Sequence, residues 1–269
     1  MTLCSTYSSC AVTGLSVIAP GVVCGGMGPL LRVWKPAHAN ADAGGRRGGE
    51  NGSTTETGGS QATAAAASET TMAVLPSTAV IHLIRPCHQL HDGAQEAGAR
   101  VRVAVCGHKQ VVIVAVTTAP RLSIEVVWRL PELDDLVVEA EWVHTMVSSA
   151  AAGSGGGAED LALVYAHNLV EVWPYNSAAA ARRVLATDRS LLYSAKVMPQ
   201  VDGTAPGFYV AAGTVFSEVL IWSGADRAPA PAQEDGGGGG GGNAEAPVEC
   251  KLTGHQGVIM AIDVTVSVV

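Results

Sequence analysis

Short runs of valine, isoleucine and leucine follow one another along most of the chain, separated by glycine, proline, aspartate and asparagine. Runs of β-branched residues between such turn formers are typical of short β-strands. No window of about eleven residues repeats apolar side chains at the spacing of an amphipathic helix. The pattern predicts an all-β protein, with strands over residues 21–25, 30–34, 79–84, 101–106, 111–116, 122–130, 137–143, 161–165, 169–173, 191–197, 208–212, 219–222 and 258–264.

Two segments of low complexity interrupt these strands. Residues 38–75 combine glycine and arginine with an alanine tract, and residues 223–247 pass through alanine and proline into a run of glycines. Neither segment contains enough apolar side chains to offset the entropy lost on folding. We expect the first to be a disordered insertion and the second a flexible one.

A strand, a tight turn and a second strand that ends in tryptophan recur three times. The tryptophans are Trp34, Trp173 and Trp222, and His167 stands in the turn before the second of them. A period near 40–45 residues with four strands per repeat is typical of β-propeller blades, in which the aromatic side chain packs between neighbouring sheets. These residues are therefore candidates for a structural repeat rather than for catalysis.

The sequence Leu-Thr-Gly-His, which ends in Gly254 and His255, matches the Gly-His entry to a WD-repeat blade. We expect the His255 ring to hydrogen-bond within its blade. The predicted fold is an incomplete WD-repeat β-propeller of about three to four blades. Residues 1–37 supply its first strands, residues 76–222 its blades and residues 248–269 the start of the next blade, with insertions at 38–75 and 223–247.

The net charge is −8, so the chain has no field that attracts phosphate backbones, and binding to nucleic acid on its own is not expected. Six cysteines without a Cys-x-x-Cys pair indicate free thiols in a reducing compartment. The apolar N-terminus has no basic start and is interrupted by Gly14 and Pro20, which argues against a signal peptide or a membrane span. We expect a cytoplasmic protein without a membrane partner.

Two motifs could bind a cofactor or a metal. The glycines of residues 21–28 resemble a nucleotide-binding loop, but a phosphate site requires a helix after the loop, and residues 29–34 have the pattern of a strand. Cys87, His88, His91 and Asp92 could bind a metal, but no second ligand pair stands elsewhere, so a polar loop is favoured. We expect no cofactor, no metal and no small-molecule substrate.

Charged residues on the predicted strands offer two further candidates. Glu139 and Glu141 alternate along one strand after Asp134 and Asp135, which fits either an acid–base pair or, as we favour, a solvated strand face. Five arginines could contact phosphate groups, but no exposed aromatic residue for base stacking is evident beside them, so a solvated rim is favoured. These arginines are residues 100, 102, 182, 183 and 189.

Residues 210–222, followed by residues 252–259, resemble the amino-terminal propeller of the WD repeat-containing protein 6 family, and residues 25–34, 161–173 and 191–195 are similar to other strands of it. The resemblance implies a regulatory subunit that positions tRNA for 2′-O-ribose methylation of the anticodon wobble nucleotide. In that family a partner methyltransferase supplies the chemistry, so the resemblance implies no catalytic residue in this chain.

The chain differs from the family in its two insertions, in ending at Val269 within a blade and in holding one propeller. We therefore expect a non-enzymatic WD-repeat scaffold whose partners are a tRNA 2′-O-ribose methyltransferase and, within that complex, tRNA. The alternative is a general WD-repeat scaffold for protein complexes unrelated to tRNA.

Overall fold

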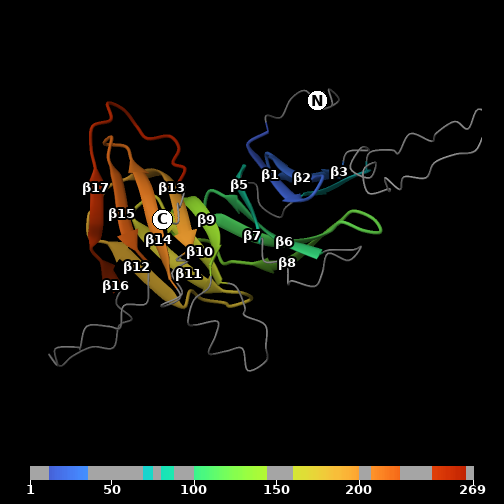
Figure 1. The fold of residues 1–269 in the computed structure, drawn as a ribbon. Helices are drawn as coiled ribbons and strands as arrows, with labels where there is room; N and C mark the ends of the chain where they lie inside the picture. The colour runs from blue at the N-terminus through green and yellow to red at the C-terminus, as the bar shows by residue number, and fades with distance from the viewer. Residues whose placement is uncertain are drawn as a thin grey trace, which may run out of the picture.

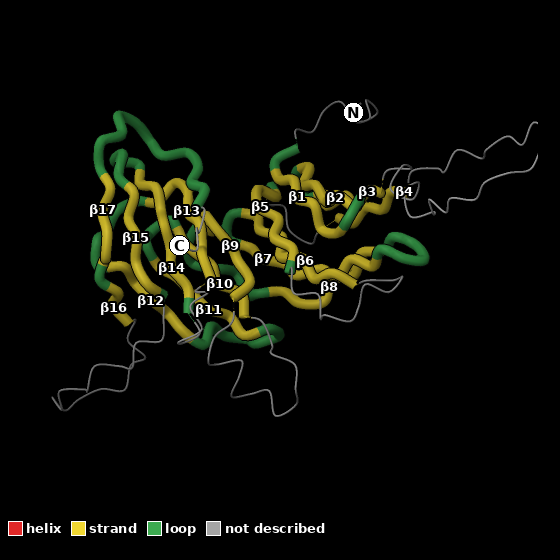
Figure 2. The backbone as a smooth tube through the Cα atoms, viewed as in Figure 1, coloured by secondary structure: helices red, strands yellow, loops and turns green. Residues whose placement is uncertain are grey.

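The computed structural model describes residues 12–35, 69–74, 80–87, 100–143, 160–199, 207–224 and 244–264. All the regular secondary structure in these residues is β-strand, 17 strands in total, as Figure 2 shows. The prediction of an all-β protein is confirmed. The described residues also contain no helix of the length and apolarity that crossing a membrane requires.

The strands form four sheets, which we name blades 1 to 4 in chain order (Figure 1). Blade 1 contains β1 (Gly14–Ala19), β2 (Val22–Met27), β3 (Leu30–Lys35) and β4 (Glu69–Val74). Blade 2 contains β5 (Ile81–Pro86), β6 (Arg100–Gly107), β7 (Gln110–Thr117) and β8 (Ser123–Arg129). Within each of these blades, consecutive strands pair antiparallel.

The other two blades follow the same plan. Blade 3 contains β9 (Val137–Val143), β10 (Asp160–Tyr165), β11 (Leu169–Pro174) and β12 (Arg182–Ala186), with the short β16 (Ala244–Ala246) parallel to β12. Blade 4 contains β13 (Leu192–Pro199), β14 (Phe208–Thr214), β15 (Val219–Ser223) and β17 (Val248–Leu252). This arrangement is an incomplete propeller, because the four blades of the described residues do not close into a ring.

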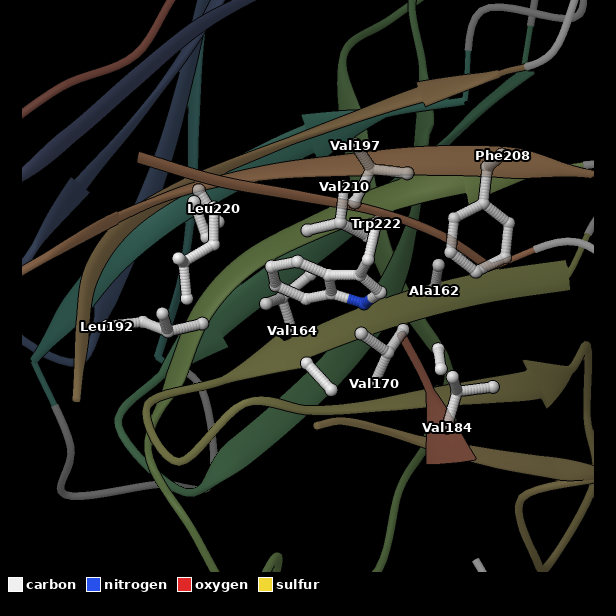
Figure 3. Close-up of a cluster of buried hydrophobic side chains, with 14 of the residues drawn as sticks. Ala162, Val164, Val170, Val184, Leu192, Val197, Phe208, Val210, Leu220 and Trp222 are labelled. Atoms are coloured by element: carbon white, nitrogen blue, oxygen red, sulfur yellow. The ribbon is translucent and has the colours of Figure 1, made fainter. Parts of the chain in front are cut away.

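The hydrophobic core is divided among the three junctions between successive blades. One cluster lies between blades 1 and 2, one between blades 2 and 3 and one between blades 3 and 4. Figure 3 shows the third, in which Phe208, Val210 and Trp222 of blade 4 face Val164 and Val170 of blade 3. Strand β10 is buried along its whole length because blade 3 has a neighbour on each face.

A backbone hydrogen bond recurs at each junction. The first residue of a blade donates its N–H to a carbonyl in the hairpin between the second and third strands of the preceding blade. The three bonds, measured from N to O, are Ile81 to Gly28 at 2.9 Å, Val137 to His108 at 2.9 Å and Leu192 to Ala166 at 2.8 Å. We call Ile81, Val137 and Leu192 the opening residues, and the bond fixes the position of each blade on the one before it.

The structure corrects several strand predictions. The last residues of the expected insertion 38–75 form β4, and Ala244–Ala246 of the expected insertion 223–247 form β16. Both are edge strands that pair on one side only, β4 with β3 and β16 with β12. Strands β1, β12 and β17 were not predicted, and the predicted strand 258–264 has no regular structure over residues 258–264. The remaining residues of both expected insertions lie outside the described part of the chain.

Candidate interaction site

The three repeated tryptophans occupy the third strand of their blades. Trp173 on β11 is buried between blades 2 and 3, and Trp222 on β15 is buried between blades 3 and 4. Trp34 on β3 is half-buried and lies so close over Gly25 that a Cβ there would be 2.9 Å from the indole ring. The glycine is thus required by the close approach of Trp34. In blade 2 the third strand carries no tryptophan, and Val114 is buried within it.

The other predicted repeat residues lie in loops. His167 stands in the turn between β10 and β11, where Asn168 adopts a φ of 64°. Gly254 adopts a φ of 118° after β17, a conformation that favours glycine. His255 is exposed, and its ring makes no hydrogen bond to any residue that the structure describes. The expected hydrogen bond of His255 within its blade is therefore not formed here.

A buried carboxylate at Glu171 organises the centre of blade 3. The Tyr165 hydroxyl donates to it at 2.6 Å and the Trp173 Nε1–H at 3.0 Å, while Arg183 Nε lies 2.8 Å from its other oxygen. Burial and then the Glu171 charge raise the pKa of the Tyr165 hydroxyl well above its ordinary value. Three donors on one carboxylate make a structural site that holds β10, β11 and β12 together.

Glu139 is a second buried carboxylate, and its ion pair with the partly exposed Arg85 links blades 2 and 3. The Arg85 guanidinium binds its two carboxylate oxygens at 2.9 and 2.8 Å. Burial raises the pKa of the neighbouring Glu141 carboxyl. The predicted solvated face of this strand is wrong for Glu139, which is 4% exposed, because blade 2 covers it.

Loops at the hairpin ends of blades 3 and 4 are tied by charged side chains. His167 Nδ1 and its backbone N lie 2.9 and 3.0 Å from Asp135 Oδ2, which joins the hairpin of blade 3 to the loop that enters that blade. In blade 4, Lys251 Nζ lies 2.7 Å from Glu218 and 3.1 Å from Asp188. These carboxylates raise the pKa of the Lys251 ammonium group.

A groove at the opposite ends of blades 2 and 3 combines arginine with aromatic rings. The Arg102 guanidinium carbon lies 4.6 Å from the centroid of the Tyr175 ring and 5.5 Å from that of Trp142. The Tyr175 ring meets Trp128 edge-on at 5.5 Å. A cavity of about 320 Å³ opens here; we call it the arginine–tyrosine groove, and it is lined by Arg100, Arg102, Ala115, Val127 and Tyr175.

Sequence reasoning identified the two arginines of the groove but not its aromatic residues. Tyr175 follows β11 and meets Arg102 of β6 only because blades 2 and 3 pack face to face. The other candidate arginines have different roles. Arg183 pairs with Glu171, Arg182 donates to the Gly224 carbonyl at 2.8 Å, and Arg189 is exposed.

The structure describes the whole of the glycine-rich motif at residues 21–28 but only Cys87 of the candidate metal-binding motif. Residues 22–27 form β2, and Gly26 receives the side chain of Ile81, so the glycine-rich segment is a strand and a hairpin. Cys87 is buried with its Sγ 3.7 Å from Arg102 Nη2, and residues 88, 91 and 92 lie outside the described residues. In the described part of the chain, no three potential ligand side chains gather at one point.

Comparison with known proteins supports no family assignment. No model of a known protein family matches the chain, and no curated protein matches it. A chain in the crystal structure of an active polycomb repressive complex 2 in the basal state matches 52% of this chain and 26% of its own length, with 13% identity and a TM-score of 0.38. BBS1N in complex with ARL6DN matches 82% of this chain and 52% of its own length, with 10% identity and a TM-score of 0.44.

The class of the protein therefore follows from its own geometry. Four sheets of antiparallel strands, joined in sequence by the same backbone bond and packed through three separate cores, are the blades of an incomplete β-propeller.

Proposed function

We propose that this chain is a non-enzymatic propeller scaffold that acts as a regulatory subunit of a tRNA 2′-O-ribose methyltransferase. The arginine–tyrosine groove is the observation that carries the proposal, because it joins two guanidinium groups to an aromatic ring at a rigid blade junction. The resemblance of residues 210–222 and 252–259 to the WD repeat-containing protein 6 family supplies the class of partner.

The chemistry of the groove suits a nucleotide. Guanidinium groups bind phosphate oxygens in a bidentate manner, and aromatic or guanidinium planes stack on unpaired bases. Arg100 is exposed and pairs with the exposed Glu125 at 2.6 Å, so a phosphate can replace that carboxylate at small cost. A cavity of about 320 Å³ lies at the lower end of the range for small-ligand sites.

Because the chain is negatively charged, the proposal requires the partner enzyme to supply part of the tRNA-binding site. At −8, the chain as a whole repels a polyanion, so two arginines cannot hold tRNA alone at physiological ionic strength. In the proposal, the methyltransferase supplies most of the phosphate contacts and the groove fixes one nucleotide. Tight binding of tRNA is then expected only in the complex.

The test compares groove variants in the assembled complex. The full chain is co-expressed with a 2′-O-ribose methyltransferase, and wobble-nucleotide methylation is measured by mass spectrometry of digested tRNA. We expect Arg102→Ala and Tyr175→Ala to lower methylation about tenfold, which corresponds to about 1.4 kcal/mol, whereas the exposed Arg189→Ala leaves it unchanged. If no methyltransferase co-purifies with the full chain, the alternative of a scaffold unrelated to tRNA is favoured instead.

A further inference from the structure

The residue just before each opening residue is apolar and exposed to solvent. Val80, Leu136 and Leu191 stand in these positions and are 40%, 45% and 40% exposed. Each lies at a junction between two blades that the structure describes, so a neighbouring blade is present on both sides of the junction. Three successive junctions thus present a large apolar side chain at the same place in the repeat.

These three positions follow one another along one face of the molecule. Each opening residue is bonded to the hairpin of the preceding blade, which places the residue before it at the hairpin ends of the blades. The first strands β5, β9 and β13 contact one another in succession (Figure 1). Val80, Leu136 and Leu191 therefore lie in an arc, at the opposite ends of the blades from the arginine–tyrosine groove.

Phe216 extends this arc on blade 4. It is 68% exposed in the β14–β15 hairpin, and the residue before it donates its N–H to the Leu191 carbonyl at 3.0 Å. The same hairpin position in blade 3 is His167, since the next residues, Asn168 and Ser217, both have a positive φ, of 64° and 69°. The His167 side chain is 74% exposed although blade 4 follows it, so exposure at this position does not depend on whether a blade follows.

The backbone of these residues is already hydrogen-bonded within the propeller. The Leu136 N–H donates to Asp135 Oδ1 at 2.7 Å, and the Leu136 carbonyl accepts from Ala166 N at 2.9 Å. The Phe216 N–H donates to the Thr214 hydroxyl at 3.2 Å. A partner therefore contacts this face through side chains and must satisfy its own backbone, as an α-helix does.

Carboxylates outnumber cations in the loops, hairpins and strand ends of this face. The carboxylates are Glu132, Asp134, Asp135, Asp188 and Glu218, and the cations besides histidine are Lys109, Arg189 and Lys251. Lys251 is shared between two of these carboxylates, and the whole chain carries a net charge of −8. Basic side chains of a partner are therefore attracted to this face, whereas a second copy of the chain is repelled.

We propose that Val80, Leu136, Leu191 and Phe216, here named the apolar arc, bind an amphipathic helix of a partner protein. The apolar stripe of that helix covers the arc, and lysine or arginine beside the stripe pairs with the surrounding carboxylates. Single exposed apolar residues are ordinary, but a contiguous series marks an interaction surface. The apolar arc is separate from the arginine–tyrosine groove, so the proposal does not rest on the function proposed for that groove.

The test uses a labelled peptide of about 18 leucine and lysine residues, or about five helical turns, with all its leucines on one face of the helix. Binding to the full chain is followed by fluorescence anisotropy. We expect saturable binding that weakens as the salt concentration rises. A peptide of the same composition with its leucines spread around the helix, and one with glutamate in place of lysine, are each expected to bind at least tenfold more weakly.

Variants of the protein locate the binding site. The double substitution Leu136→Ser and Leu191→Ser is expected to weaken binding at least tenfold, and so is Phe216→Ser alone. Val126→Ser provides the matched control, because Val126 is 36% exposed on β8, outside the apolar arc, and its substitution leaves binding unchanged.

Three outcomes would overturn the proposal. One is the absence of saturable binding, or equal binding of the two leucine–lysine peptides. Another is equal binding by the apolar-arc variants and Val126→Ser. The third is concentration-dependent dimerisation of the full chain that the double substitution abolishes, because it would identify a second copy as the occupant.

Discussion

At the scale of single residues, the carboxylates show most clearly how environment decides role. Glu171 is 3% exposed and accepts hydrogen bonds from Tyr165 and Trp173, whereas Glu125 lies on the surface beside Arg100. A buried charge without its partners is costly, but an exposed pair contributes little because water screens it. The two glutamates should therefore differ strongly when they are removed.

Glu171→Ala is expected to lower the free energy of unfolding by about 3 kcal/mol or more, because it leaves buried donors of Tyr165 and Trp173 without an acceptor. Glu125→Ala should change it by less than about 1 kcal/mol. Urea denaturation followed by tryptophan fluorescence measures both. Equal effects of the two substitutions would contradict a structural role for the Glu171 site.

At the scale of elements, His82 links two blades and should make the fold sensitive to acid. Its Nε2 lies 2.8 Å from the Val137 carbonyl, its ring faces His108 at 5.9 Å between centroids, and burial lowers its pKa below the ordinary 6.5. The unfolded chain therefore binds a proton near pH 6.5, whereas the folded chain does so only at lower pH. The stability that His82 contributes is complete above pH 6.5 and declines as the pH falls below it.

His82→Gln keeps a donor for the Val137 carbonyl but does not titrate. Between pH 8 and pH 5, the melting temperature of the unmodified protein should fall further than that of His82→Gln, while His255→Gln, at an exposed position, should follow the unmodified protein. The raised pKa of Glu141 has the opposite effect on stability, because the folded state keeps the Glu141 proton to higher pH and so gains stability as the pH falls. This contribution is the same in all three proteins and does not affect their comparison. Parallel melting curves for the unmodified protein and His82→Gln would contradict this prediction, because they would mean that the pKa of His82 is the same in the folded and unfolded states.

Local pattern sufficed for strands whose apolar residues are buried between blades, such as β6 and β10. It failed for β4, half of whose residues are polar, and for the three-residue β16, because the pairing of both depends on a neighbouring strand. It failed in the reverse sense at residues 258–264, where alternation predicts a strand but no second strand is present among the described residues. The sequence predicted the arginines of the groove but not its aromatic residue, because Arg102 and Tyr175 meet only when blades 2 and 3 pack against each other.

At the scale of the whole molecule, the blades interact in sequence, each through its own core, so the protein should behave like a chain of coupled units. Trp222 is fully buried between blades 3 and 4. Trp222→Ala should lower stability by about 3–5 kcal/mol. Because the loss falls on one junction, amide hydrogen exchange should quicken in β10, β11 and β13–β15 while β6 and β7 keep their protection.

Trp34→Ala provides the matched control. Trp34 occupies the third strand of blade 1, as Trp222 does in blade 4, but it is half-buried on the face of blade 1 that has no neighbouring blade among the described residues. Its removal should therefore cost less than that of Trp222 and leave exchange in blades 3 and 4 unaltered. Equally rapid exchange in all four blades after Trp222→Ala would mean that the junctions do not act separately and that the propeller unfolds as one cooperative unit.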